Sequence, residues 1–522
     1  MAELALKVEA QFDIKKKEGN STLEKFERTL TEELIFGICS PIGSLKEKVI
    51  EKLRERLTTE YQYDVKIIKM SEFIDRYELS DEEQKDLPET PNGSKIFKEY
   101  FEKINKGNII RKFNKNERLA EYAVQRIHLD RVKTTKKNKN LDENPKSTDY
   151  ESQRVCYILD SIKTKEELLL LKKIYSDNFY SISIFSPLED RKTNLKSKKF
   201  ENPEIENIIE IDDKQKDRFG QNVRDVFVNG DLFIRVSKDN IPIIQEKISR
   251  FLHLIFETSI ITPSIEETSM YNAKAAAGNS ACLSRQVGAC IIDNANNILS
   301  IGWNDVPKYG GNLYSSGSAI DHRCFQHEFC SNDKQKLHVV ENIVESILND
   351  KQLSELRHIE GIEELLKDKI KNNTKVKDLI EFSRSVHAEM HAIIQGALTS
   401  GDKILNGRLF CTTYPCHNCA RHIIAAGIRE VYYIEPYVKS LCITLHDDAM
   451  SENEDAQNKV KILIFDGISP NKYLSFFSNF AERKENGKLI KKDLKTAKPK
   501  TSKTLQALST LEEQAVLTLA DS

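Results

Sequence analysis

Short apolar runs recur through the first half of the chain, separated by stretches with helical spacing. Leu45, Val49, Leu53 and Leu57 repeat every four residues, which predicts an amphipathic helix after the first run. The runs, which predict buried strands, are Leu34–Phe36, Val155–Leu159, Tyr180–Phe185 and Leu232–Val236. Strands that alternate with helices are typical of a mainly parallel sheet with flanking helices. We therefore expect an α/β domain over residues 31–258.

The second half has a denser alternation of strands and helices. A helix over Pro242–Glu257 and the break at Thr262 and Pro263 separate it from the first half. The expected elements are strands Gln286–Asp293, Ile298–Trp303, Arg408–Thr413, Glu430–Ile434 and Val460–Phe465, and helices Val386–Leu398 and His417–Ala426. The first two strands are expected to pair with each other. The pattern predicts a second α/β domain over residues 265–480.

Three segments are polar and lack a clear apolar period. Residues 1–30 are expected to be a polar N-terminal extension, and residues 481–522 a basic and polar C-terminal tail. Within that tail, Arg483–Pro499 is expected to be a solvated extension. The basic stretch Arg131–Lys139, together with the polar residues up to Asp149, is expected to be a mobile loop.

Composition and charge narrow the class of protein. With 522 residues, the chain is longer than one hydrophobic core usually organises, which favours two domains or more. The 79 basic and 81 acidic residues give a net charge of -2, so no global field draws the chain to nucleic acid or an anionic membrane. There is no apolar run of about 18 residues and no basic-then-apolar start, so we expect a cytoplasmic protein with no membrane partner. In the reducing cytosol, the ten cysteines are better explained as metal ligands or buried thiols than as disulfides.

The strongest chemical signal is a pair of short motifs. His387-Ala388-Glu389 is followed by Pro415-Cys416-His417-Asn418-Cys419, which is the H-x-E and P-C-x-x-C pattern of zinc deaminases. His387, Cys416 and Cys419 would hold zinc and leave a fourth position open for water. Glu389 would be the general base and then the general acid.

A closed structural zinc site is the alternative interpretation. It would need a fourth protein ligand, for which His391 and His417 are candidates. A closed site gives no reason for a glutamate two residues after the histidine, so the catalytic interpretation is preferred.

The motifs resemble the cytidine deaminase superfamily, and more closely its deoxycytidylate deaminase branch. The resemblance covers roughly residues 265–475 and implies a cytidine deaminase-like α/β/α sandwich. Ser284–Ala289 resembles the entry strand of that branch, and Gly302–Pro307 its nucleotide-binding turn. Asn304 is thereby a candidate for contacts to deoxyribose. Arg285 is a candidate phosphate contact, although an arginine at a strand end is more often solvated or paired.

A long insertion over Lys308–Arg384 is also similar to that branch, whereas transfer-RNA adenosine deaminases make a short connection there. The insertion contains His322, Cys324, His327 and Cys330, which can bind a second, structural zinc. The alternative is two buried thiols and two surface histidines.

Downstream stretches resemble one bacterial group, the anti-phage deoxycytidine triphosphate (dCTP) deaminases, which join a P-loop kinase-like domain to the deaminase. The stretches are Tyr437–Leu441, Leu445–Asp448, Leu463–Phe465 and Gly467–Pro470. The resemblance implies an enzyme that converts free dCTP or deoxycytidine monophosphate (dCMP) to dUTP or dUMP and ammonia, and thereby depletes dCTP during phage infection.

The same resemblance implies several partners. Members of the group are held inactive by a partner, often a small RNA, which the basic runs Arg131–Lys139 and the C-terminal tail can contact, although such runs are usually just solvated. Related enzymes form homo-oligomers and are controlled by an allosteric deoxynucleoside triphosphate. The alternative functions are a cytosine or adenine deaminase acting on DNA or RNA, a dCMP deaminase of ordinary pyrimidine metabolism, and a scaffold with a vestigial deaminase. The intact zinc motif argues against the last of these.

The first half contains a loop, Gly37 through Gly43 to Ser44, that resembles a P-loop. The two glycines are one residue further apart than in the motif, and Ser44 stands where a lysine would reach the β- and γ-phosphates, so phosphoryl transfer should be poor. Asp160 ends the next strong strand, where P-loop kinases often place an acidic residue near Mg²⁺. The loop is predicted either to bind nucleotide, with or without Mg²⁺, or to be a structural relic of a degenerate P-loop kinase-like domain.

Overall fold

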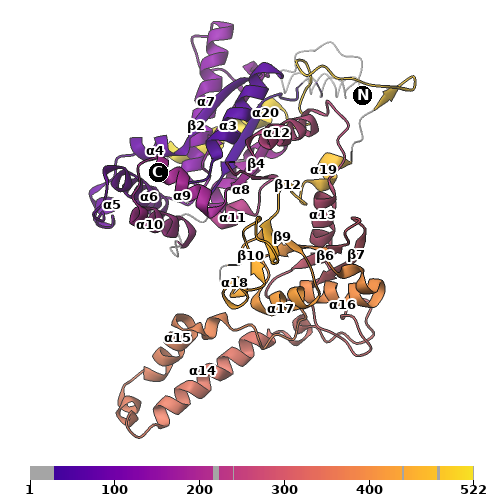
Figure 1. Cartoon of the computed structure of the whole chain (residues 1–522). Coiled ribbons are helices and arrows are strands. Elements are labelled where there is room, and N and C mark those ends of the chain that lie inside the picture. The colour runs from indigo at the N-terminus through magenta and orange to yellow at the C-terminus, as the bar shows by residue number, and fades with distance from the viewer. Residues whose placement is uncertain are drawn as a thin grey trace, which may run out of the picture. The chain divides into compact units, whose positions relative to one another are not determined.

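The structure is a computed structural model that describes residues 27, 29–214, 223–238, 240–437, 440–478, 483–501 and 503–520. The expected N-terminal extension, residues 1–30, lies almost wholly outside the described residues, as do Val438 and Lys439 of the stretch Tyr437–Leu441. The chain divides into two compact units, 1–261 with 480–522, and 262–479 (Figure 1). Each unit is described by itself.

The first unit is built on a parallel sheet with the strand order β5-β4-β1-β3-β2. The strands are β1 (Leu34–Cys39), β2 (Asp64–Lys69), β3 (Val155–Asp160), β4 (Phe179–Phe185) and β5 (Leu232–Arg235). Every residue of β1 is buried, as expected of a central strand covered on both faces. The predicted parallel α/β architecture is confirmed.

Helices connect and flank these strands. They are α3 (Lys46–Thr59), α4 (Met70–Arg76), α5 (Asp81–Lys85), α6 (Lys95–Phe113), α7 (Arg118–Lys139), α8 (Lys165–Tyr175), α9 (Leu188–Ser197), α10 (Asn202–Lys214), α11 (Val223–Phe227), α12 (Ile241–Phe256) and α20 (Leu505–Ala520). The apolar face of α3 predicted from the sequence, with Val49, Leu53 and Leu57, is fully buried. Helix α12 packs against α3.

Two segments differ from expectation. Arg131–Lys139 is not a loop but the last part of helix α7, and Arg131 is buried, with its guanidinium paired to Glu33 and Glu512. The C-terminal segment is not wholly a solvated tail, because α20 packs on α7 and buries Leu508 and Glu512. An exposed hairpin, β13 (Lys484–Glu485) and β14 (Lys488–Leu489), agrees with a solvated stretch. Both errors arose because buried polar residues hide the apolar period of the two helices.

The second unit contains a mixed sheet with the strand order β10-β11-β9-β8-β6-β7. The strands are β6 (Gly288–Ile292), β7 (Ile298–Trp303), β8 (Arg408–Thr413), β9 (Glu430–Glu435), β10 (Met450–Ser451) and β11 (Val460–Ile464), and β12 (Gly467–Ile468) follows. Strand β6 is antiparallel to β7 and β8, and the remaining pairs are parallel. The predicted pairing of the first two strands is confirmed.

Helices α13 (Ile265–Ala277) and α16 (Ala388–Ser400) pack against this sheet. The other helices of the unit are α14 (Ser331–Asn349), α15 (Ile362–Asn373), α17 (His417–Ala425), α18 (Cys442–Leu445) and α19 (Tyr473–Phe477). A Cβ added at Gly288 would meet the backbone of α13, and one added at Gly302 would meet the backbone of α16. Gly302 pairs with Ala289, the neighbour of Gly288, so the two positions face opposite sides of the sheet. The α/β/α layering predicted from the sequence is therefore confirmed.

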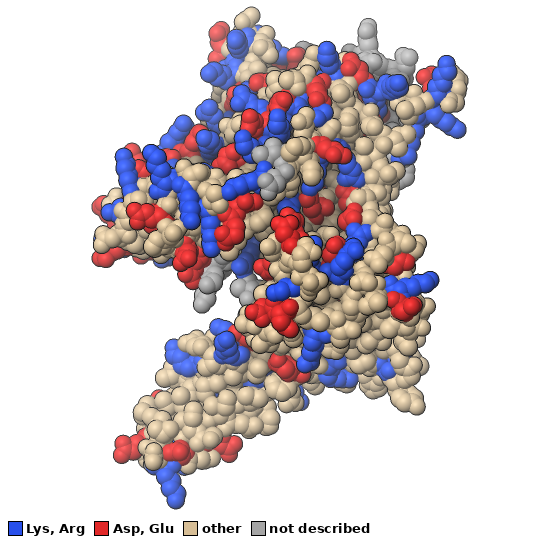
Figure 2. Space-filling model, in the orientation of Figure 1, with Lys and Arg blue, Asp and Glu red and all other residues tan. Residues whose placement is uncertain are grey.

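The predicted insertion contributes α14 and α15, which pack against each other (Figure 1). None of the described helices is long and apolar enough to cross a membrane. Acidic and basic side chains are interspersed over the face shown in Figure 2, in line with the net charge of -2.

Candidate active site

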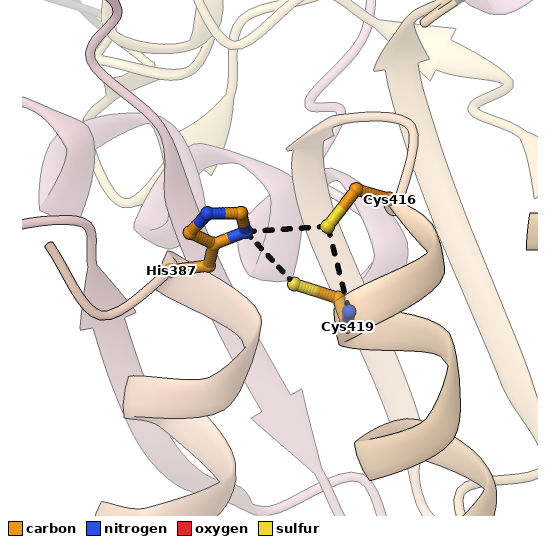
Figure 3. A group of neighbouring side chains, drawn as sticks. All are labelled: His387, Cys416 and Cys419. Carbon is orange, nitrogen blue, oxygen red and sulfur yellow. Dashed lines mark hydrogen bonds between the residues drawn. The ribbon is translucent and has the colours of Figure 1, made fainter. Parts of the chain in front are cut away.

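Two helix N-termini in the second unit present the residues of the zinc motif. His387 immediately precedes α16, and Cys416 immediately precedes α17 as its N-cap, with its sulfur accepting a hydrogen bond from the backbone N–H of Cys419 at 3.4 Å. Figure 3 shows the three side chains pointing toward one another from the starts of these two helices. A residue at the N-terminus of a helix lies where the helix dipole favours negative charge, which suits a thiolate.

The geometry of these three side chains fits a tetrahedral metal ion. Nδ1 of His387 lies 3.3 Å from Sγ of Cys416 and 3.3 Å from Sγ of Cys419. Usual zinc bond lengths to nitrogen and sulfur place such atoms about 3.6 Å apart in a tetrahedral site. Among the described residues, these three form the one group of potential metal ligands whose donor atoms all lie within 4.8 Å of one another.

The pKa values of these three side chains also favour the binding of a metal cation. A hydrogen bond from Cys419, together with His387, lowers the pKa of Cys416 to about 4, whereas burial raises the pKa of Cys419. Burial tends to lower the pKa of His387, but the hydrogen bond and charge of Cys416 outweigh it and leave that pKa raised. The site therefore carries a thiolate near neutral pH.

Glu389 lies in the first turn of α16 and is 4% exposed. Burial is the main cause that raises the pKa of this carboxyl group, and the nearby negative charge of Cys416 raises it further. A carboxyl group in such surroundings binds and releases a proton closer to neutral pH than an exposed glutamate does. Glu389 can therefore exchange protons with a ligand in the site.

The two histidines considered as a fourth ligand have other partners. His391 accepts a hydrogen bond from the backbone N–H of Trp303 at Nδ1 (3.2 Å), and its Nε2 lies 3.1 Å from Oδ1 of Asn312. Nε2 of His417 lies 3.3 Å from Oε1 of Glu381. Neither histidine joins the metal-binding group. The closed-site interpretation therefore has no fourth protein ligand from these two histidines.

A cavity of about 330 Å³ opens onto these residues. His387, Glu389 and Cys416 line it together with residues of the β8 end, the segment before β6 and the insertion. The sequence did not predict which residues of the insertion line this cavity, because nothing in the local pattern of the insertion indicates which of its residues fold back toward the zinc motif. These residues are Cys324, Cys330, Ser331, Asn332, Ile380, Ser383 and Arg384.

Asn304 and Arg285 both line the cavity, but each is engaged by the protein itself. The side-chain amide of Asn304 accepts from the backbone N–H of Val287 at 2.7 Å and donates to the backbone carbonyl of Arg285 at 2.8 Å. Arg285 forms an ion pair with Glu435 at 3.1 Å. In this structure the Asn304 side chain fixes the backbone that leads into β6. Arg285 forms an ion pair within the protein, which agrees with the alternative that a strand-end arginine is solvated or paired.

The four residues proposed for a second zinc are not brought together as a metal-binding group. The rings of His322 and His327 stack with centroids 6.2 Å apart, and Cys324 is buried. Sγ of Cys330 lies 3.6 Å from Oγ of Ser284. The four donor atoms do not meet the spacing that the group His387, Cys416 and Cys419 satisfies.

The P-loop-like segment of the first unit is shorter than the sequence suggested. Gly37 lies within β1, where a Cβ would collide with the side chains of Ile162 and Phe179, so packing requires this glycine. Gly43 has a φ of +80°, and Ser44 is buried. The turn therefore begins only after β1 ends.

The chain matches one family model, described as the cytidine and deoxycytidylate deaminase zinc-binding region, over residues 263–435. The similarity to this family is confined to that region, about a third of the chain. The match contains the complete zinc motif and lies within the second unit, which we call the deaminase unit.

Three curated relatives show how far the similarity extends. The chain is 46% identical over 59 residues to ComE operon protein 2 of Bacillus subtilis, covering 10% of this chain and 29% of that protein. It is 26% identical over 151 residues to a probable deoxycytidylate deaminase of Drosophila melanogaster, covering 28% of this chain and 48% of that protein. It is 24% identical over 314 residues to deoxycytidylate deaminase of Saccharomyces cerevisiae, covering 57% of this chain and 80% of that protein. The chain thus spans less than half the length of the first two relatives.

Among solved structures, a dCMP deaminase of cyanophage S-TIM5 in complex with dCMP and dUMP is similar. The two share 22% sequence identity, with a TM-score of 0.23, over 39% of this chain and 99% of that chain.

Proposed function

We propose that the deaminase unit removes the 4-amino group of a free deoxycytidine nucleotide by zinc-dependent hydrolysis. The observation that carries the proposal is the buried Glu389 beside the group His387, Cys416 and Cys419, at the base of a cavity of about 330 Å³. The match to the zinc-binding region of cytidine and deoxycytidylate deaminases supports the reaction class.

The chain's own residues have separate roles in this proposal. His387, Cys416 and Cys419 hold the metal, and the start of α17 stabilises the thiolates. Zinc bound there supplies Lewis acidity, which makes water a usable nucleophile near neutral pH. Glu389 takes a proton from the attacking water, then delivers protons to the ring nitrogen N3 and to the departing amine. Attack at C4 expels ammonia and leaves uracil.

A free nucleotide is the favoured substrate rather than a base within DNA or RNA. Nucleic-acid editors track the backbone with a strongly basic groove and stacked aromatic residues. The face in Figure 2 mixes both signs of charge, and the chain carries a net charge of -2. Two of the relatives bear the name deoxycytidylate deaminase. We infer that dCTP, dCMP or both are substrates, and that depletion of dCTP in anti-phage defence is the biological role.

The proposal includes the partners that the resemblance implies: an inhibitory small RNA, an allosteric deoxynucleoside triphosphate and a second copy of the chain. Arg131 is buried and cannot contact RNA without local unfolding, whereas Lys133 and Lys137 on the same helix are exposed. Exposed lysines of the C-terminal hairpin, such as Lys484 and Lys488, are the other candidates.

The test is a substrate panel for zinc-loaded protein: dCMP, dCTP and a cytosine-containing oligonucleotide, with products separated by chromatography. We expect uracil nucleotide from one or both free nucleotides and no uracil in the oligonucleotide. The variant Glu389→Gln should lose activity by a factor of about 10²–10⁴. The exposed Glu341→Gln, on helix α14, is the matched control. Conversion of the oligonucleotide alone would replace this proposal with an editing function.

A further inference from the structure

Helix α14, in the insertion of the deaminase unit, carries two rows of apolar side chains. Val340 and Val344 are 2% and 1% exposed, and α14 packs against α15. Val339, Ile343 and Ile347 repeat every four residues along a neighbouring side of the helix, where Ile343 is 37% exposed and the other two are half-buried. Helix α14 thus buries one apolar row and presents the other at the surface.

The rest of the hairpin formed by α14 and α15 is also rich in exposed apolar side chains. Helix α15, which is described throughout, buries none of its residues, and its Leu365 is 52% exposed. Leu353 and Ile359, between the two helices, are exposed as well. Figure 2 shows a broad face over this hairpin with few charged side chains, which lie mainly at its edges. Extended apolar faces of this kind mark contact sites between proteins.

Opposite charges stand at the two ends of the surface row of α14. Lys336 comes seven residues before Ile343 and Asp350 seven residues after it, so both lie on the same side of the helix as Ile343. Glu341 and Glu345 lie about 200° around the helix from Ile343, on its other side. The row is therefore basic at its start, apolar in its middle and acidic at its end. We call it the outer row: Lys336, Val339, Ile343, Ile347 and Asp350.

A row with this order of charges is complementary to itself when the partner helix runs in the opposite direction. A two-fold axis at Ile343 brings Val339 against Ile347 of a second copy, and Lys336 against Asp350 of that copy. In a closed two-fold assembly both subunits use the same surface patch. A patch that meets opposite charge when it faces itself therefore favours a second copy of this chain over other partners.

We propose that the outer row is the interface between two copies of this chain, with their α14 helices antiparallel. The start of α14 also forms part of the wall of the cavity beside the zinc motif, through Ser331 and Asn332. The side-chain amide of Asn332 donates to the backbone carbonyl of Leu379 at 3.0 Å, which ties this wall to the end of the insertion. A second copy bound along α14 therefore also fixes the cavity wall.

The test is sedimentation equilibrium of the full, zinc-loaded chain over a wide range of protein concentration. The wild type should show a species of at least twice the chain mass of 60.0 kDa. Ile343→Glu places two like charges against each other at the two-fold axis and should weaken association more than about 100-fold. Leu337→Glu is the matched control, because Leu337 is 43% exposed on the same helix but lies about 120° around it from Ile343. It should associate as the wild type does.

Exchange of the two end charges separates contact between copies from damage to the hairpin. Lys336→Asp and Asp350→Lys each place like charges opposite each other, so each alone should weaken association at least about tenfold. The double variant, and an equal mixture of the two single variants, should restore it. Lys336→Asp also loses the hydrogen bond from Lys336 to the carbonyl of Lys377. Within one chain residues 336 and 350 lie on the order of 20 Å apart, so only a second copy can supply the restoring charge.

Each measurement can overturn the proposal. A monomeric wild type, or equal association of Ile343→Glu and the wild type, would leave the outer row to a different partner. Single variants that weaken association without restoration in the double variant would overturn the antiparallel arrangement. The readout is mass and not activity, so failure of the proposed deamination would leave this result unchanged.

Discussion

The Cys416 thiolate and the Glu389 carboxyl group lie in the same buried site, and the charge of the first raises the pKa of the second. Cys416 needs no proton near neutral pH, since its pKa is about 4. The pKa of Glu389 is shifted in the opposite direction, because burial favours the protonated form of its carboxyl group. In the proposed reaction, a lasting negative charge for the metal and a mobile proton for the substrate would thus come from two neighbouring side chains with different surroundings.

Loss of a single thiolate should remove the metal. We expect Cys416→Ser to bind zinc more than about 100-fold less tightly, because even residues that only support a metal ligand are worth 10–100-fold in affinity. Zinc per protein after dialysis, measured by atomic emission, checks this. Cys290→Ser is the control, since Cys290 is a buried thiol of β6 outside the metal-binding group. Full zinc content in Cys416→Ser would rule out the assigned ligand set.

The buried His391 should make the deaminase unit less stable in acid. Burial lowers the pKa of His391 below its ordinary value of 6.5. The unfolded chain therefore takes up a proton at this residue before the folded chain does, and stability falls as pH drops below about 6.5, by up to about 1.4 kcal/mol per pH unit. We expect His391→Gln to lose less unfolding free energy than the wild type between pH 8 and pH 5.5.

Urea unfolding followed by Trp303 fluorescence measures this, because Trp303 is the one tryptophan of the sequence and its ring contacts that of His391. The comparison is made with both proteins loaded with zinc. His338→Gln, at an exposed position on α14, should keep the pH dependence of the wild type. An unchanged slope in His391→Gln would disprove the role assigned to His391.

At the scale of elements, two glycines allow the sheet of the deaminase unit to lie between its helices. Gly288 and Gly302 let α13 and α16 approach the sheet on opposite faces. Helix α16 starts with Ala388 and Glu389, so its distance from β7 also determines where Glu389 lies. The glycines therefore link packing directly to the chemistry of the site.

Gly302→Ala should weaken the deaminase unit and slow its reaction together. The added Cβ would lie 2.4 Å from the carbonyl oxygen of Ala388 and from the backbone nitrogen of Ala392, so α16 must move. Such overpacking costs roughly 1–3 kcal/mol. Unfolding free energy and kcat measured on the same sample check both effects. Gly317→Ala, where the nearest atom is 4.0 Å away, is the control. Wild-type stability in Gly302→Ala would contradict the close packing.

The elements that carry the zinc motif were predictable because their signals are local. The motif consists of two short segments, and the spacing within each segment places its residues at the start of a helix: His387 and Glu389 at α16, and Cys416 and Cys419 at α17. Strand β2 was missed because it carries one buried residue, Ile68, and so has no apolar run. The contact between Ile42 and Asp212 joins residues 170 positions apart, and no local pattern encodes it.

At the scale of the whole molecule, the first unit is completed by a helix from the far end of the chain. Helix α20 packs on α7, and its Glu512 pairs with the buried Arg131, which also pairs with Glu33. Three buried charges in contact depend on one another, because removing one leaves the others without compensation. The C-terminal segment is thus part of the folded unit, contrary to the expected tail.

Replacing Arg131 should destabilise the first unit strongly. Arg131→Met leaves the buried Glu33 without this cation and leaves Glu512 with only the ring of His128, 3.5 Å away, which costs roughly 3–5 kcal/mol. Scanning calorimetry should show a transition shifted to lower temperature. Arg126→Met, at an exposed position on the same helix, should leave it unchanged. Equal transitions in the two variants would show that the buried charges contribute little.

The central claim, that this chain hydrolyses the 4-amino group of a free deoxycytidine nucleotide, has one direct test. Zinc-loaded protein is incubated with dCTP and with dCMP in water labelled with oxygen-18, and the masses of the nucleotide products are measured by mass spectrometry. The account predicts a uracil nucleotide that carries one heavy oxygen, formed by the wild type and not by Glu389→Gln. Recovery of both nucleotides unchanged from wild-type protein that contains stoichiometric zinc would contradict it.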